Sequence, residues 1–380
     1  MIYRFSILPA ILLLFTACQL REDNRESIGG MLITSEYENV LEAEEPVIRE
    51  PSEGAIRIEE YFSNKIKNGF NGTIIYAENG EITFSKASGF SNLRTKDSLE
   101  LESAFQLASV SKPITALALL KLYEMGKVNL EDTVQQYLPE FPYSGISIRM
   151  LLNHRSGLSN YMYFSDEFWP DREIPITNRD VLDLMVKHKP KPYYPPDRRY
   201  NYSNTNYMLL ALIIEEVSEM SFEAFVKLNI FLPLDMSTSL IYNKKDYPDN
   251  FNQVKGYSSG RRMAENSYLN GVVGDKGVYA SALDLFKLDQ ALYNGSLVSD
   301  STLEEAFSLQ HDDLRIYDNY GLGWRINASD PDNKVVYHTG WWKGFRTYFL
   351  RELGSKKTLI VLSNTNRSSS LGIRELISLI

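Results

Sequence analysis

Ser109 and Lys112 are the two residues of this sequence whose types and spacing best suit nucleophilic catalysis. Residues three apart share one face of a helix, so an ammonium group would lie beside the serine hydroxyl. An adjacent cation favours the serine alkoxide, and N–H groups at the start of a helix can stabilise an oxyanion. The alternative interpretation is an N-cap serine followed by a solvated lysine, because a pattern of two fixed positions also arises by chance.

A buried helix is predicted to hold these two residues in place. Pro113 is tolerated only in the first turn of a helix, so the helix should begin close to Ser109. Gly126 is typical of the residue that follows a helix C-terminus. Burial on nearly all sides is predicted because apolar residues cover most of the helix circumference, namely Ile114, Leu117, Leu119, Leu120, Leu122 and Met125.

Two more polar motifs follow along the chain, Tyr202-x-Asn204 and His338-Thr339-Gly340. A tyrosine with its ordinary pKa of about 10 is not ionised at neutral pH, but a nearby lysine would favour the phenolate. A glycine in a strand allows a ligand or another backbone to approach closely. The alternatives are a packing tyrosine, an ordinary asparagine before a helix and a structural histidine in a strand.

Length and composition limit the classes of function. The chain has 380 residues, of which 43% are hydrophobic, enough for a large core and two lobes. A net charge of −9 without a long basic run argues against nucleic acid as a partner. The single cysteine, Cys18, permits no disulfide within the chain, and the four histidines lack metal-ligand spacing. We expect no metal and no other cofactor.

The first 17 residues predict a signal peptide, in which Arg4 precedes an apolar run too short to span a bilayer. Residues 15–18 (Phe-Thr-Ala-Cys) resemble a bacterial lipoprotein cleavage site, where Cys18 becomes the lipidated N-terminus, although Phe15 replaces the usual leucine. The alternative is an ordinary signal peptide with an incidental cysteine. Residues 18–53 are rich in glutamate and predict a tether.

The residue after the cysteine bears on the location of the protein. Gln19 in place of aspartate resembles the outer-membrane choice of Gram-negative lipoproteins. We therefore expect a lipoprotein of the bacterial cell envelope, anchored in a membrane and facing the periplasm or the surface.

The rest of the chain predicts an α+β fold, in which helices flank an antiparallel sheet and a mostly helical lobe is inserted. Asn79-Gly80 separates two β-prone runs and predicts a hairpin, which follows a predicted helix over 56–66. Helical patches lie among many Pro and Tyr residues in the middle of the chain. We predict an α/β lobe formed by residues 54–130 and 265–380, with a helical lobe over 131–264.

Three segments carry more specific expectations. Residues 151–158 are expected to end a helix at Gly157, and Thr205 is expected to cap an apolar helix over 208–217. A glycine-rich turn over 271–282 is expected to lead into an amphipathic helix.

Together these motifs resemble the serine β-lactamase-related family, which includes class C β-lactamases, D,D-peptidases, D-aminopeptidases and esterases. Residues 151–158 match its Leu-Leu-x-His-x-Ser-Gly signature, and residues 274–285 resemble its later glycine-rich segment. The resemblance covers roughly residues 55–380 and includes three motifs in the expected order, Ser109-x-x-Lys112, Tyr202-x-Asn204 and His338-Thr339-Gly340.

The resemblance implies a serine hydrolase that works through an acyl-enzyme. Ser109 would attack a carbonyl carbon, Lys112 would place a positive charge beside it, and Tyr202 would be the general base. The oxyanion hole would consist of the N–H groups of Ser109 and Trp341. Water would then hydrolyse the acyl-enzyme.

The resemblance also implies a substrate-binding group of residues. Asn204 would donate to the surroundings of the lysine or to a substrate amide, and Gly340 would let the strand edge approach the substrate. The substrate-binding and oxyanion residues are then Asn204, His338, Thr339, Gly340 and Trp341.

The third motif departs from the Lys-Thr-Gly usual in class C β-lactamases and D,D-peptidases, where the lysine helps to hold a substrate carboxylate. His338 is mostly neutral at pH 7, so we expect weaker carboxylate recognition and poor β-lactam turnover. Favoured substrates are esters or amides, such as D-amino-acid peptides and cell-wall fragments. Arg346 could supply the positive charge that the third motif lacks. The aromatic residues of 161–169 could line the site or pack within the helical lobe.

Two other hydrolase interpretations stay open. One is a true class C β-lactamase. The other is an α/β-hydrolase, because Ser258 lies in a Gly-x-Ser-x-Gly pattern followed by Asp284 and His311. That pattern needs a buried strand before it and a helix after it, and the flanking residues predict neither.

An interpretation from a different class is a non-catalytic lipoprotein that binds penicillin or peptidoglycan. The predicted tether and the altered third motif favour it. The complete set of Ser109, Lys112 and Tyr202 argues against it.

Overall fold

The computed structural model of the chain describes residues 50–242, 254–258, 261–310, 319–330, 332–366 and 371–380. The predicted signal peptide, Cys18 and nearly all of the predicted tether lie outside the described residues, as does His311. Residues Glu50–Ile380 form one compact unit.

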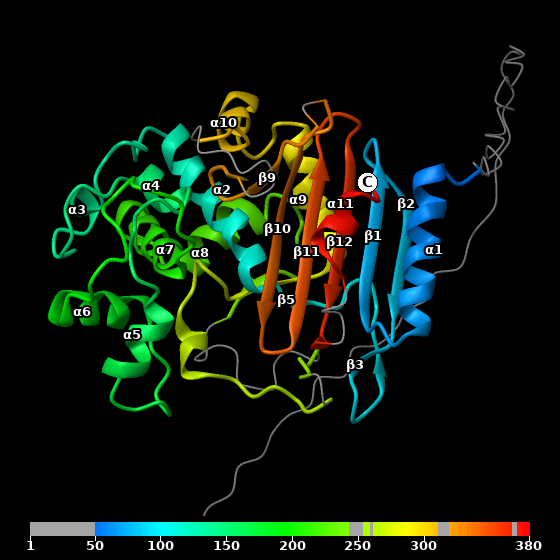
Figure 1. Cartoon of the computed structure of the whole chain (residues 1–380), viewed down its shortest axis with the longest axis horizontal. Coiled ribbons are helices and arrows are strands. Elements are labelled where there is room, and N and C mark those ends of the chain that lie inside the picture. The colour runs from blue at the N-terminus through cyan, green and yellow to red at the C-terminus, as the bar shows by residue number, and fades with distance from the viewer. Residues whose placement is uncertain (1–49, 243–253, 259–260, 311–318, 331, 367–370) are drawn as a thin grey trace, which may run out of the picture. The chain divides into compact units, whose positions relative to one another are not determined.

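A seven-stranded antiparallel sheet is the centre of this unit (Figure 1). The predicted hairpin is confirmed, because Asn79 and Gly80 both have positive φ and join the first two strands. In spatial order the strands are β2 (Glu81–Ser88), β1 (Gly72–Glu78), β12 (Lys357–Ser363), β11 (Phe345–Glu352), β10 (Val335–Trp342), β9 (Arg325–Asn327) and β8 (Asn319–Tyr320).

Helices pack on both faces of this sheet, as the predicted α+β fold requires. Side chains alternate along a strand, so Ile74 and Ile75 of β1 enter two different hydrophobic clusters. The cluster around Ile74 includes α1 (Glu53–Lys67) and α11 (Ile373–Ile377). The cluster around Ile75 includes α2 (Ser111–Glu124) and α9 (Ala282–Tyr293).

Most other helices come from the middle of the chain and lie beyond one edge of the sheet (Figure 1). They are α3 (Val134–Tyr137), α4 (Ile148–Leu152), α5 (Tyr161–Phe168), α6 (Asn178–His188), α7 (Asn204–Ser218) and α8 (Phe222–Val226) with a π-helical turn Lys227–Phe231. A later helix is α10 (Asp300–Ala306), and a 3₁₀ turn spans Tyr268–Gly271.

Two small sheets complete the described secondary structure. One pairs β3 (Phe90–Asn92) with β4 (Asp97–Ser98). The other has the order β5 (Phe105–Gln106), β7 (Val278–Ala280) and β6 (Leu240–Ile241). Because β6 lies in the predicted helical lobe and its two partners in the predicted α/β lobe, this sheet joins them.

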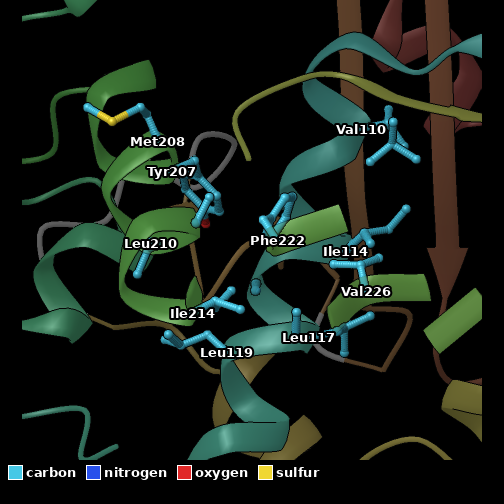
Figure 2. Packing of buried hydrophobic residues seen from close by; sticks show 14 of the residues in the cluster. Val110, Ile114, Leu117, Leu119, Tyr207, Met208, Leu210, Ile214, Phe222 and Val226 are labelled. Atoms are coloured by element: carbon cyan, nitrogen blue, oxygen red, sulfur yellow. The ribbon is translucent and has the colours of Figure 1, made fainter. Parts of the chain in front are cut away.

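The helix α2 is buried along nearly its whole length, as its apolar pattern predicts. Its C-terminus forms a Schellman motif, in which the N–H groups of Gly126 and Lys127 donate to Tyr123 and Leu122. Tyr207 of α7 and Phe222 of α8 lie against α2 in Figure 2. One continuous core therefore runs from the sheet through α2 into the helices of the middle segment.

Two local predictions were wrong. The helix α4 ends at Leu152, not at Gly157, because His154 adopts a left-handed conformation with φ of 60°. Thr205 does not cap a later helix, because α7 already begins at Asn204. The hydroxyl of Thr205 instead donates to the carbonyl of Ser159.

Candidate active site

The turn that carries Ser109 has a constrained backbone. A 3₁₀ helix, Ala108–Val110, connects β5 to α2, and Ala108 has φ of 50°, which is rare for a residue with a Cβ. The carbonyl of Leu107 accepts a hydrogen bond from Thr347 Oγ1 at 2.7 Å, and both Leu107 and Val110 are fully buried. Such local strain persists where the surroundings hold it, and it is typical of functional sites.

Lys112 is buried within hydrogen-bonding distance of the serine. Its Nζ atom lies 3.1 Å from Oγ of Ser109, 2.8 Å from Oδ1 of Asn204 and 2.8 Å from the carbonyl oxygen of Asp275. Burial lowers the pKa of Lys112 to about 7. The Arg325 guanidinium also lowers this pKa, whereas the Asp275 carboxylate raises it. The neutral amine is therefore well populated at neutral pH and can accept a proton.

Tyr202 lines the same cavity as this serine. Lys112 Nζ lies 5.0 Å from the centroid of the Tyr202 ring. Burial nevertheless raises the pKa of Tyr202 above its ordinary value, and the nearby Ser109 side chain and the Arg325 guanidinium oppose this rise only in part. The phenol stays neutral, so these surroundings do not support the phenolate expected for a tyrosine base.

Asn204 opens α7 and points at the lysine. Its Oδ1 atom accepts the hydrogen bond from Lys112, while its Nδ2 atom lies 3.1 Å from Sδ of Met162. Asn204 therefore orients the amine by accepting from it, whereas donation was expected.

His338 does not reach the candidate site, contrary to the predicted substrate-binding role. It is fully buried, with Nε2 3.0 Å from the Tyr320 hydroxyl and Nδ1 2.9 Å from the carbonyl oxygen of Thr339. Because a carbonyl can only accept, Nδ1 carries the proton. Burial, with help from Arg325 and Lys112, lowers the pKa of His338 well below its ordinary value. Side chains alternate along a strand, and this alternation directs the His338 side chain into the core. Its hydrogen-bond partner Tyr320 was not predicted from the sequence.

The other three residues of this segment line a cavity of about 500 Å³ together with Ser109 and Tyr202. They are Thr339, Gly340 and Trp341. A Cβ at Gly340 would lie 2.3 Å from the carbonyl oxygen of Leu107. Gly340 thus lets β10 approach the backbone before the serine, whereas a close approach to substrate was expected.

The main-chain N–H of Trp341 points away from β11. Lys343 and Gly344 both have positive φ and form a two-residue hairpin turn, which closes at the pair Trp342 and Phe345. Hydrogen-bonded pairs alternate along an antiparallel ladder, so Trp341 belongs to a pair that is not hydrogen-bonded. On the other side of β10 the register with β9 ends at Tyr337. No strand of the described residues pairs with this side of β10 beyond Tyr337, so the N–H can bind an oxyanion at the strand edge.

A buried polar network behind the lysine was missed in the sequence. The Tyr161 hydroxyl donates to Oδ2 of Asp275 at 3.1 Å, and Nζ of Lys276 contacts the same hydroxyl. Burial lowers the pKa of Lys276 to about 8, although Asp275 opposes this. Tyr161 is thus a core residue. The sequence signal for this network was the charged pair Asp275-Lys276, which lies between two glycines.

Two arginines also line the cavity, Arg325 from β9 and Arg346 from β11. The Arg325 guanidinium lies 5.3 Å from the centroid of the Tyr202 ring, and that of Arg346 lies 4.6 Å from the Trp341 ring. Arg325 was not among the predicted site residues. It lies in β9, a strand of three residues between β10 and β8, which is too short to give a distinctive sequence pattern.

The α/β-hydrolase pattern has no matching structure. Ser258 is half-buried, and its hydroxyl donates to the carbonyl of Arg262 at 3.2 Å. The Asp284 carboxylate accepts hydrogen bonds from the hydroxyls of Thr238 and Ser239. The described residues directly before this serine, 254–257, form no strand, so the structure gives the pattern no support.

Within the described parts of the chain, no group of three or more His, Cys, Asp or Glu side chains is arranged to hold a metal ion. No helix among the same residues is long and apolar enough to cross a membrane.

Comparison with known proteins gives the family. The model of a protein family described as Beta-lactamase matches residues 60–378. The chain belongs to the β-lactamase family. This confirms the resemblance that the sequence motifs indicated.

Relatives and solved structures agree with this assignment. This β-lactamase-family protein is 38% identical to Penicillin-binding protein 4* of Bacillus subtilis (strain 168), over 78% of this chain and 69% of that protein. It is 29% identical to Teichoic acid D-alanine hydrolase of Staphylococcus aureus (strain MRSA252), over 61% of this chain and 56% of that protein. The octameric penicillin-binding protein homologue from Pyrococcus abyssi superposes with a TM-score of 0.71 at 26% identity, covering 82% of this chain and 73% of that chain.

Proposed function

We propose that this β-lactamase-family protein is a serine hydrolase that cleaves an ester or amide through an acyl-enzyme at Ser109. The observation that carries the proposal is the position of Lys112, whose buried Nζ lies 3.1 Å from Oγ of Ser109. A lysine with a pKa lowered to about 7 is the kind of base that can activate a serine at neutral pH.

The proposed acylation step moves one proton in a closed cycle. The neutral amine of Lys112 takes the hydroxyl proton of Ser109 as Oγ bonds to the substrate carbonyl carbon. The N–H groups of Ser109 and Trp341 stabilise the oxyanion that forms. As the bond to the leaving group breaks, the neutral hydroxyl of Tyr202 gives its proton to that group and regains one from the Lys112 ammonium.

Deacylation repeats the sequence with water in place of the serine. Water loses a proton to the Lys112 amine while its oxygen bonds to the acyl carbon, and Ser109 leaves with a proton returned from the ammonium. In this scheme Tyr202 relays a proton and Lys112 is the base. Asn204 holds the amine, because its Oδ1 atom accepts from Nζ at 2.8 Å.

The proposed substrates are D-amino-acid esters or amides, or fragments derived from the cell wall. The relative named a teichoic acid D-alanine hydrolase supports an ester of a D-amino acid. The relative named Penicillin-binding protein 4* favours a second candidate function, covalent capture or turnover of β-lactams.

The test is a side-by-side assay of p-nitrophenyl acetate, a D-alanyl p-nitroanilide and nitrocefin. The full chain is compared with Ser109→Ala, and a fluorophosphonate probe reports whether the serine is nucleophilic. Turnover of the ester or the anilide that is lost in the variant supports the hydrolase. Fast turnover of nitrocefin would make the protein a β-lactamase. A chain without turnover or labelling would be a binding protein.

We also propose that the protein is a lipoprotein anchored through Cys18 in a bacterial envelope membrane. The support is the sequence of residues 1–19 alone. Metabolic labelling with an alkynyl fatty acid tests it: the wild-type chain should carry label and fractionate with membranes, and Cys18→Ser should do neither.

A further inference from the structure

Arg325 and Arg346 place two positive charges at the cavity that contains Ser109. Neither guanidinium has a carboxylate partner among the described residues. The groups that raise the pKa of Arg325 are all tyrosines, and the group that raises the pKa of Arg346 is Tyr348. The Nε atom of each is buried without a hydrogen-bond partner in the described structure. A cation that is partly removed from water without an anion is costly, so the cavity is suited to receive a negative charge.

The strand register places both arginines on the same face of the sheet. Arg325 lies opposite Tyr337, and Arg346 lies opposite Trp341. Directly opposed residues share a face, and alternate residues of one strand share it too, so both arginines lie on the face of Thr339. Thr339 is two residues from each opposed position, or about 7 Å along the strand.

Thr339 therefore stands between two guanidinium groups on the wall of the cavity. Its hydroxyl can donate a hydrogen bond, and each guanidinium offers a planar fork of donors that matches a carboxylate or a phosphate.

We propose that Arg325 and Arg346, with Thr339 between them, bind an anionic group of the substrate, a carboxylate or a phosphate. This reverses the expectation, drawn from His338, that the site favours substrates without such a group. The positive charge that the third motif lacks is supplied by the strands on both sides of it. The inference rests on the proposed function, since it describes the substrate of the same site.

The position of Arg325 also indicates where the anion lies on the substrate. Its guanidinium packs on the ring of Tyr202, which in the proposed mechanism protonates the leaving group. The Arg346 guanidinium packs on the ring of Trp341, whose N–H faces the oxyanion. An anion between them belongs on the leaving group, close to the bond that is cleaved.

The experiment measures binding in the full chain carrying Ser109→Ala, so that it does not depend on turnover. Three ligands of one shape are compared by calorimetry: 4-acetoxybenzoate, 4-acetoxyphenyl phosphate and the neutral methyl 4-acetoxybenzoate. At least one of the two anions should bind ten or more times as tightly as the neutral ester. Which anion binds more tightly distinguishes a carboxylate site from a phosphate site.

The arginine variants are then tested in the same background. Arg325→Gln and Arg346→Gln should each reduce the preference for the anion at least fivefold, and Arg346→Lys should retain part of it. Arg57→Gln removes one exposed positive charge from α1 and should leave the preference unchanged. If an arginine variant does not fold, the salt dependence of anion binding to the unaltered cavity replaces it, because screening weakens an ionic contact.

Equal affinity for the anions and the neutral ester would overturn the inference, as would an anion preference that survives loss of both arginines. Failure of the proposed function looks different. In that case the chain with Ser109 intact hydrolyses no ester or amide and takes no fluorophosphonate label, whatever the preference measured by calorimetry.

Discussion

The amine of Lys112 lies 3.1 Å from the hydroxyl of Ser109, and the surrounding protein buries that amine completely. Close contact and burial act together. Contact allows the proton to pass, and burial lowers the pKa of the lysine to about 7 so that the amine is free to accept it.

The pH dependence of activity should report the ionisation of Lys112. Protonation removes the base, so kcat/KM for p-nitrophenyl acetate should fall as the pH decreases through about 7, the pKa that burial gives this lysine. Lys112→Met should lower kcat/KM by about 10²- to 10⁴-fold, the usual contribution of a positioned base. An unchanged profile between pH 6 and 8 would exclude Lys112 as the base.

Asp275→Asn should move this acidic limb to lower pH. The Asp275 carboxylate raises the pKa of Lys112, so its removal lets burial depress that pKa further. The backbone carbonyl of Asp275, which accepts from Lys112 at 2.8 Å, stays in place. Asp183→Asn serves as the control, because it removes one exposed carboxylate from α6. A limb that moves to higher pH would contradict the assigned electrostatics.

Tyr202→Phe should separate the hydroxyl of this residue from its ring. The ring lies 5.0 Å from Nζ of Lys112 and would keep its packing, so folding should be preserved. Loss of the proton relay should lower kcat by about 10²- to 10⁴-fold. An amide substrate should suffer more than a p-nitrophenyl ester, because p-nitrophenolate leaves without being protonated. Equal losses for both substrates would refute the relay.

Gly340→Ala should destabilise the fold next to the serine. The new Cβ would lie 2.2 Å from Oγ1 of Thr347 and 2.3 Å from the carbonyl oxygen of Leu107, so β10 and the turn before the serine must separate. We expect the free energy of unfolding to fall by about 3 kcal/mol, the upper part of the range for overpacked interiors. Urea unfolding measures it.

Gly372→Ala is the matched control for that substitution. Among the described residues its Cβ would meet only the side chain of Glu375, at 3.8 Å or more, and its effect should be within about 0.5 kcal/mol, as for ordinary surface changes. If the two variants unfold at the same urea concentration, the close approach of β10 to Leu107 is not rigid.

Much of the fold follows from local sequence. Asn79-Gly80 specified a hairpin because its two residues tolerate positive φ, and the apolar circumference of residues 111–124 specified a buried helix. Ser109 and Lys112 were found because their three-residue spacing is itself a local property of a helix. Thr205 was wrongly expected to cap α7, because the first turn of that helix is polar and faces the site, where Asn204 contacts the lysine.

The sequence by itself determined which residues carry the chemistry and which family they belong to, because those signals are short motifs along the chain. Only the tertiary structure decided their roles. Whether Lys112 or Tyr202 is the base depends on burial and on neighbouring charges, and the charges, Asp275 and Arg325, come from segments far along the chain from both residues. In the same way, strand register buried His338 and brought Arg325 and Arg346 to one cavity, because pairing between strands sets which side chains share a face.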